Sequence, residues 1–168
     1  METFEAIRTV LAVRQFQETP IPEDVVREIV DAAHLTASSI NGQPWHFVVV
    51  QNKETLRQFA ALARSGPYIA QAPLAVVVST TLSPYDVSDA SRAIQDMILT
   101  AWSHGVGSNW VGFHGLDAIK PLVGLPDDDD VLAIVPFGYP VKTLGAGKKK
   151  RKPLGEVAFR ERFGQPFE

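Results

Sequence analysis

Three short, unbroken apolar runs limit the folds open to this chain. They read "FVVV" (47–50), "LAVVV" (74–78) and "VLAIV" (131–135). Runs of this length without polar alternation are typical of strands covered on both faces, and they are far too short to cross a membrane. Segments with helical spacing lie between them. The chain is therefore expected to pack helices on a sheet, in an α+β or α/β fold.

The helical segments follow the 3.6-residue period and are bounded by capping or breaking residues. We expect them at 4–13, 23–35, 53–63, 88–104 and 116–124. In the first segment Phe4, Ile7 and Leu11 are expected to share one helical face. Asn52 is expected to cap the third helix. The acidic run "DDDD" at 127–130 is expected to form a solvated turn.

Length and composition indicate one globular domain. The chain has 168 residues, of which 45% are hydrophobic and 21% charged, so we expect a single domain over 1–168. It contains no cysteine, which excludes disulfides, thiolate zinc sites and thiol nucleophiles. Glu2 and Glu5 stand where a secretory signal would be basic and then apolar. A soluble cytoplasmic protein with no membrane partner is the expectation.

Basic residues are concentrated at the C-terminal end. Residues 148–168 hold seven Lys and Arg against three Glu, whereas residues 1–147 hold nine against sixteen Asp and Glu. The run "KKKRK" (148–152) is open to three interpretations: a solvated tail, a phosphate clamp or a nucleic-acid contact. The acidic remainder disfavours nucleic acid as a partner. The polar segment 143–168 is expected to be extended and to pack on a partner subunit, which favours a homodimer.

Most common catalytic chemistries lack their residues here. The four histidines show no helical pair at metal-ligand spacing, so no metal site is expected. No G-x-S-x-G elbow surrounds a serine. The glycine-rich stretch "GVGSNWVG" (105–112) lacks the P-loop lysine and follows a helix. If the chain is an enzyme, a cofactor is expected to supply the reactivity.

Four stretches, in this order, resemble the nitroreductase family of flavin enzymes. They are "FEAIRTVLAVRQFQETPIP", "ASSINGQPWHFVVV", "SRAIQDMILTAWSHGVGSNWVGF" and "KRKPLGEVAF". The most specific motif is N-x-Q-P-W-x-F, with V-R-x-F upstream and G-x-G-S-x-W-x-G downstream. The resemblance implies an α+β, nitroreductase-like fold with a central mixed sheet flanked by helices. It also implies a homodimer that exchanges its C-terminal tails and holds FMN at the subunit interface.

The resemblance also implies an activity. Members of the family take hydride from NADH or NADPH and pass the electrons to nitroaromatics, quinones or other small conjugated acceptors by a ping-pong mechanism. Ser38, Ser39 and Asn41 match residues that line the flavin pocket, from the opposite subunit. Val111 and Gly112 match the stretch whose backbone N–H approaches flavin N5, where a glycine lets the main chain come close.

Cations complete the site that the resemblance implies. Arg14 matches a basic residue beside the pyrimidine edge of the flavin, where a cation offsets the charge of the reduced ring. Lys149 and Arg151 match tail residues that contact the FMN phosphate. No metal belongs to this site.

One segment departs from the family pattern. Most members carry two basic residues and a serine just before V-R-x-F, and these hold the FMN phosphate. Here Val10, Leu11 and Ala12 occupy those positions, and none has a side-chain donor. Two alternatives follow. Either the run at 148–152 holds the phosphate instead, or the chain is a divergent flavin-binding protein with weak or no turnover.

Overall fold

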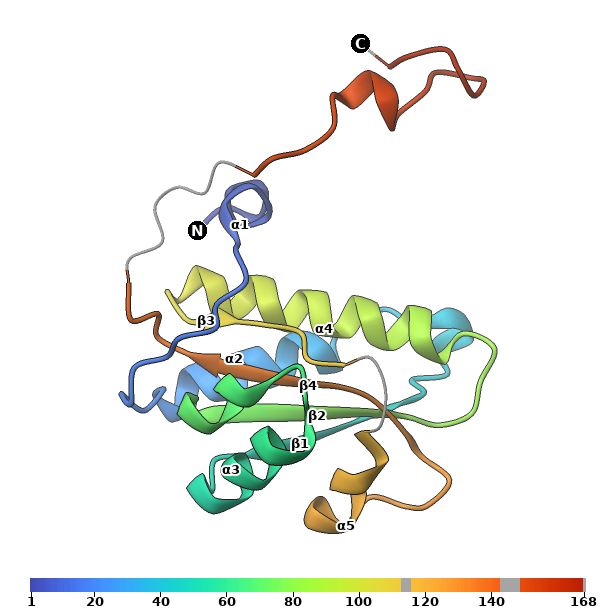
Figure 1. The fold of residues 1–168 in the computed structure, drawn as a ribbon. Helices are drawn as coiled ribbons and strands as arrows, with labels where there is room; N and C mark the ends of the chain where they lie inside the picture. The colour runs from blue at the N-terminus through green and yellow to red at the C-terminus, as the bar shows by residue number, and fades with distance from the viewer. Residues whose placement is uncertain (113–115, 143–148, 168) are drawn as a thin grey trace.

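The computed structural model describes residues 1–112, 116–142 and 149–167. Helices cover both faces of a central sheet (Figure 1). The elements, in chain order, are α1 (Thr3–Thr9), α2 (Glu23–His34), η1 (Ser39–Asn41), β1 (Trp45–Val50), α3 (Lys53–Leu62), η2 (Pro67–Gln71), β2 (Leu74–Thr80), α4 (Asp86–Ser103), β3 (Gly107–Ser108), η3 (Leu116–Ile119), α5 (Lys120–Val123), β4 (Asp130–Gly138) and η4 (Leu154–Glu156).

The sheet has four strands in the order β1-β2-β4-β3, and the strands pair antiparallel. At its centre Val77 lies between Val48 and Ile134. Among the described residues, parallel pairing is limited to a bridge between Ala12 and Ser108, so the expected mixed character rests on that bridge. The fold is α+β, as predicted.

Strand β2 is buried along its whole length, as its apolar run predicts. Its alternate side chains serve two cores, because successive residues of a strand point to opposite faces. Leu74, Val76 and Val78 pack in the core formed with α2 and α4. Ala75 and Val77 pack in the core formed with α3 and η3.

Helix boundaries agree closely with the sequence pattern where a cap is present. The Asn52 side-chain oxygen accepts from the backbone N–H groups of Glu54 and Thr55, at 3.0 and 3.1 Å. This confirms the predicted cap of α3. The long helix α4 runs from Asp86 to Ser103, close to the predicted 88–104.

Helix α1 differs from the prediction in length and in orientation. It ends at Thr9 and buries Ala6 and Thr9. Phe4 and Ile7 are 74% and 47% exposed, so the apolar face predicted for this segment is exposed and not part of the core. The reason is a contact from outside the helix. The indole N–H of Trp102 donates to the Thr9 hydroxyl at 2.9 Å and turns the Thr9 side of α1 toward α4.

The acidic run at 127–130 is a solvated turn only in part. Asp129 is 3% exposed. Its carboxylate accepts from the Ser79 hydroxyl at 2.6 Å and lies 2.8 Å from Nδ1 of His46. It therefore joins β1 and β2 to the start of β4. The other three aspartates of the run are exposed.

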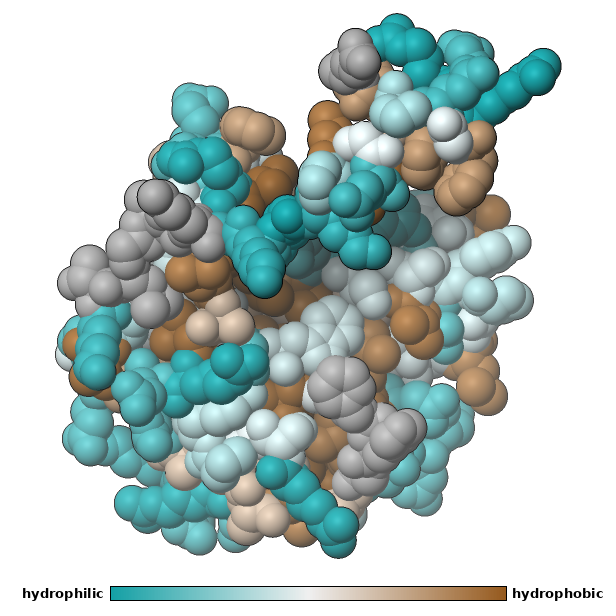
Figure 2. Space-filling model, turned by 45° about the horizontal axis from the view of Figure 1, so that its top comes forward, coloured by the Kyte–Doolittle hydropathy of each residue, from teal (hydrophilic) through white to brown (hydrophobic). Residues whose placement is uncertain are grey.

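The described part of the tail, 149–167, passes α1 and projects away from the sheet (Figure 1), and in the space-filling view it stands off from the body of the molecule as a lobe (Figure 2). Its side chains Leu154, Val157 and Phe163 are 57%, 59% and 91% exposed. The rest of the predicted tail, at 143–148 and 168, lies outside the described residues. Within the described ranges, no helix combines the length and apolar character needed to span a membrane.

Candidate functional site

The polar loop at 38–44 has an unusual backbone. Ile40, Asn41 and Gln43 have φ angles of 50°, 56° and 47°. This left-handed region is sparsely populated by residues other than glycine, and a β-branched residue such as isoleucine is rare there. Each such residue costs about 1–3 kcal/mol, so the surrounding structure must hold the loop in place.

The two serines of this loop bond within the chain. The Ser38 hydroxyl oxygen accepts from the Gln43 backbone N–H at 3.0 Å. Ser39 donates to the Asp89 carboxylate twice, from its backbone N–H at 2.8 Å and from its hydroxyl at 3.0 Å. Asn41 is exposed. The loop thus leaves the exposed amide side chains of Asn41 and Gln43, and not its serine hydroxyls, accessible to a ligand.

Asp89 is a buried carboxylate, 1% exposed, in the first turn of α4. Burial alone would raise the pKa of Asp89. The hydrogen bonds from Ser39 and the bond and charge of Arg92 outweigh burial, so the pKa lies below its ordinary value of 3.8. The group is therefore ionised at neutral pH.

A second group of predicted site residues lies along β3 and the segment that follows it. Arg14 follows Val13, whose N–H donates to the Ser108 carbonyl at 2.8 Å. The Arg14 side chain is exposed, and no described residue forms a hydrogen bond or ion pair with it. Val111 is buried and exchanges two backbone hydrogen bonds with Ile134 of β4, at 3.0 and 2.7 Å.

Gly112, which follows Val111, carries the backbone donor that the resemblance brings close to flavin N5. The residue is buried, and its N–H has no hydrogen-bond acceptor among the described residues. A Cβ at this position would lie 2.5 Å from the Leu132 carbonyl oxygen. Packing against β4 therefore requires a glycine here, in addition to the predicted close approach of a ligand. A buried N–H without a partner is costly, so a ligand acceptor would stabilise it.

The cations of the tail lie at the C-terminal end of α1. The Lys149 ammonium donates to the Ile7 carbonyl at 2.5 Å. Burial and the charge of Arg151 lower the pKa of Lys149. Among the described residues neither cation pairs with a carboxylate. Two neighbouring cations without a counter-charge among the described residues suit an anion, and Lys149 is bonded to Ile7, three residues before the Val10 position where the usual donors are missing.

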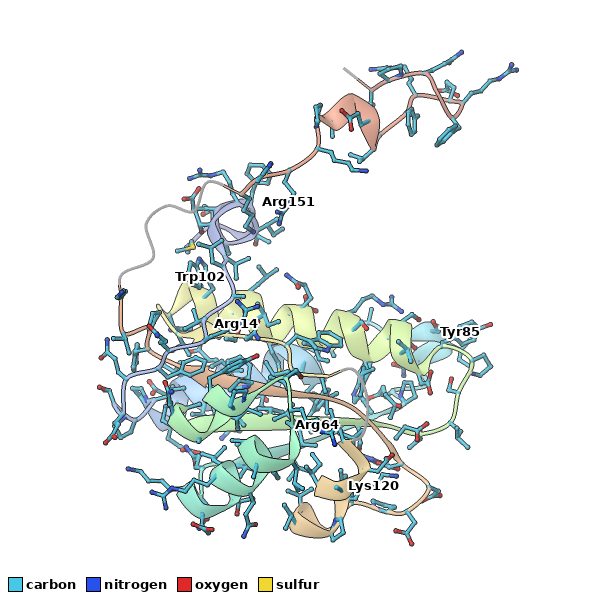
Figure 3. The ribbon with its side chains drawn as sticks, in the orientation of Figure 1. Arg14, Arg64, Tyr85, Trp102, Lys120 and Arg151 are labelled. Atoms are coloured by element: carbon cyan, nitrogen blue, oxygen red, sulfur yellow. The ribbon has the colours of Figure 1, made fainter. Side chains whose placement is uncertain are left out.

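The two groups of predicted residues are far apart within one chain. Ser39 is bonded to Asp89 and Thr9 to Trp102. Thirteen residues of α4 separate Asp89 from Trp102, which is about 20 Å at the rise of an α-helix. Figure 3 shows Arg14 and Trp102 at one end of α4 and Tyr85 at the other.

The sheet gives a second measure of this separation. The 38–44 loop leads into β1 at one edge, whereas Val111 pairs with β4 on the far side of β2. Three strand spacings separate them, about 14 Å. A single flat ring system cannot reach both groups of one chain.

Two buried carboxylates, Asp89 and Asp129, were not predicted from the sequence. Each accepts hydrogen bonds that join separate elements of the fold. A weak signal existed for Asp89, which stands four residues before Ala93 and eight before Met97 on the buried stripe of α4. A carboxylate on such a stripe requires polar partners, and the structure shows that these are Ser39 and Arg92.

Comparison with known proteins places these residues in a family context. The profile described as "Nitroreductase family" matches residues 8–83 and 68–139. A protein of Methanothermobacter thermautotrophicus, with the provisional name NADH dehydrogenase/NAD(P)H nitroreductase, is 32% identical over 154 residues. That alignment covers 86% of this chain and 81% of the relative.

Solved structures share the fold. An FMN-dependent nitroreductase from Clostridium difficile has a TM-score of 0.79 at 24% identity, over 83% of this chain and 88% of its own. The NADPH:FMN oxidoreductase of Vibrio harveyi, complexed with NAD⁺, has a TM-score of 0.85 at 23% identity, over 97% and 78%. They confirm the predicted α+β architecture.

Proposed function

The chain belongs to the nitroreductase family, and on that premise we propose that it is an FMN-dependent NAD(P)H oxidoreductase that works as a homodimer. FMN, when bound, would supply the redox chemistry for a ping-pong transfer of electrons from NADH or NADPH to a nitroaromatic, quinone or similar conjugated acceptor. The names of the relatives support the cofactor and the electron donor.

The buried N–H of Gly112 is the observation that carries this proposal. It is a preorganised donor without a protein acceptor among the described residues, which suits the N5 atom of a flavin. Arg14 supplies an exposed cation that would offset negative charge on the pyrimidine side of the ring. Both groups act by orientation and electrostatics, so no protein acid or base is required for the reaction.

The phosphate of FMN would be held by Lys149 and Arg151. Their position at the end of α1 supports a clamp that has moved to the tail, since Val10, Leu11 and Ala12 offer no side-chain donor. The mutual repulsion of the two cations would be relieved by a dianion. This favours the phosphate-clamp interpretation of the basic run; Lys148 of that run lies outside the described residues.

A second copy of the chain would complete the site. Asn41 and Gly112 of one chain are too far apart for one ring, so we infer that the 38–44 loop of each copy contacts the flavin held by the other. The projecting tail at 149–167, with its exposed apolar side chains, would pack on the same partner. Residues 1–168 would then form one domain per subunit.

The test is a spectrum followed by a rate. Purified protein mixed with FMN should retain a flavin absorption spectrum after gel filtration. It should then oxidise NADH or NADPH when a quinone or nitroaromatic is present. If the protein fraction from gel filtration is colourless after incubation with FMN, the proposal is refuted.

One alternative is a flavin-binding protein with little or no turnover. It is favoured by the absence of side-chain donors at Val10, Leu11 and Ala12. Hydrogen bonds to charged groups contribute about 1.5–3 kcal/mol each, so the loss of two could weaken FMN binding by about 10²- to 10⁴-fold. NAD(P)H oxidation at saturating FMN separates the two: a normal rate supports the enzyme, and no rate supports the alternative.

A further inference from the structure

Among the described residues, one carboxylate receives the hydrogen bonds that residues 38–42 donate to another secondary-structure element: it is that of Asp89. Their other bonds stay within the 38–44 loop, such as the Asn41 N–H to the Ser38 carbonyl at 3.1 Å. The end of the loop is fixed separately, because Pro44 is buried and its carbonyl accepts from the Thr81 N–H at 3.3 Å. The tip is not fixed by packing within the described chain, since Ile40 is 93% exposed.

We propose that Asp89 is a positioning residue for the flavin, because it holds the 38–44 loop in the strained shape that presents Asn41. This inference rests on the function proposed above. Asp89 acts through Ser39: the carboxylate receives the Ser39 N–H on one oxygen and the Ser39 hydroxyl on the other. Two donors from one residue fix both the position and the direction of the chain that enters the left-handed turn.

The chemistry of this contact calls for a carboxylate. Asp89 is almost fully buried and also receives a hydrogen bond from Arg92 on the oxygen that accepts from the Ser39 hydroxyl. An ionised carboxylate is acceptor-only and satisfies all three donors. Hydrogen bonds from Ser39 and Arg92 keep the pKa of Asp89 low in spite of burial, so the acceptor form persists at neutral pH.

The consequence for the site concerns Asn41. Its φ of 56° follows directly on that of Ile40, at 50°. Without the anchor on Ser39, the loop would relax to ordinary backbone angles and Asn41 would point elsewhere. Asp89 itself would not touch the flavin.

The test compares three variants of the full-length protein. D89A removes both Ser39 contacts. D89N retains the two Ser39 contacts, because the amide oxygen accepts from the Ser39 N–H and the amide nitrogen donates to the Ser39 hydroxyl, and it loses the Arg92 contact, because that nitrogen cannot accept. D96A is the matched control: Asp96 lies on the same helix and accepts from the Thr36 hydroxyl at 2.6 Å, with no contact to the loop. All measurements use a temperature at which far-UV circular dichroism shows each variant folded.

We expect D89A to raise the Kd for FMN by about 10- to 100-fold, the loss that corresponds to one hydrogen bond at the ligand, because Asn41 would no longer be presented to the flavin. D89N should recover most of the affinity, and D96A should bind like the wild type. At saturating FMN the visible spectrum of bound flavin should shift toward that of free FMN in D89A only. Hydrogen exchange of the peptide spanning 38–44, without flavin, should accelerate in D89A and not in D96A.

The outcomes separate the two proposals. If the wild type binds FMN and D89A binds it as tightly as D96A does, the positioning role of Asp89 is overturned and the proposed function stands. If the wild type binds no FMN, the proposed function fails and the positioning role fails with it, whatever the hydrogen exchange shows.

Discussion

The buried hydroxyl of Ser79 donates a 2.6 Å hydrogen bond to the carboxylate of Asp129, and this contact joins β2 to the turn that begins β4. D129A would leave the Ser79 hydroxyl buried without an acceptor. We expect the free energy of unfolding to fall by about 1–3 kcal/mol. Urea denaturation measures this, and D128A is the control, because Asp128 is exposed. An equal effect of the two variants would contradict the structural role of Asp129.

The carboxylate of Asp129 should make the free energy of unfolding depend on pH. Burial alone would raise the pKa of Asp129, but hydrogen bonds from Ser79 and His46 and the charges of His46 and Lys120 hold it below 3.8. A folded-state pKa below the unfolded value means that the stabilisation is complete above 3.8 and is lost as the pH falls through the lower, folded value. The stability difference between wild type and D129N should therefore shrink in acid. A difference that grows below pH 3.8 would show the opposite sign.

The tail cations should recognise the phosphate and not the ring. The double variant K149A/R151A is expected to weaken FMN binding by about 10²- to 10⁴-fold, at about 1.5–3 kcal/mol for each charged hydrogen bond. Riboflavin, which has no phosphate, should bind wild type and variant alike. Flavin fluorescence titration measures both ligands, with K152A as the control in the same run. Equal losses for FMN and riboflavin would mean that the tail contacts the ring or only supports the fold.

Restoring side-chain donors at residues 10–12 should strengthen the binding of the FMN phosphate. V10R/A12S returns a cation and a hydroxyl to positions where the family usually has them. We expect FMN to bind at least about tenfold more tightly, as one added charged hydrogen bond would give. The control is again riboflavin, whose affinity should not change. Unchanged FMN affinity would show that the phosphate lies away from residues 10–12.

The fold was predictable where the signal is local. The unbroken run at 74–78 predicted a strand covered on both faces, and β2 is that strand. Asn52 predicted the start of α3. The orientation of α1 was not predictable, because it depends on a hydrogen bond between Thr9 and Trp102, which are 93 residues apart in sequence.

The site was predictable only in outline. The family motifs predict Arg14, Asn41 and Gly112 as site residues, and that prediction awaits its test, whereas no pattern showed that the serine hydroxyls bond within the chain. Asp89 and Asp129 were missed because each acquires its role from a partner 50 residues away in sequence, Ser39 and Ser79 respectively. Whether a carboxylate is buried depends on how the whole chain packs, so it cannot be inferred from the residues next to it in sequence.

The central claim is that each flavin site combines Arg14 and Gly112 of one copy with Asn41 of the other. The direct measurement is complementation between R14A and N41A. Each variant alone should bind FMN weakly. Co-expressed with different tags, they should recover about one quarter of the wild-type sites, since half of the dimers are mixed and each mixed dimer has one intact site. Mixed dimers that bind no more FMN than either parent would contradict the claim.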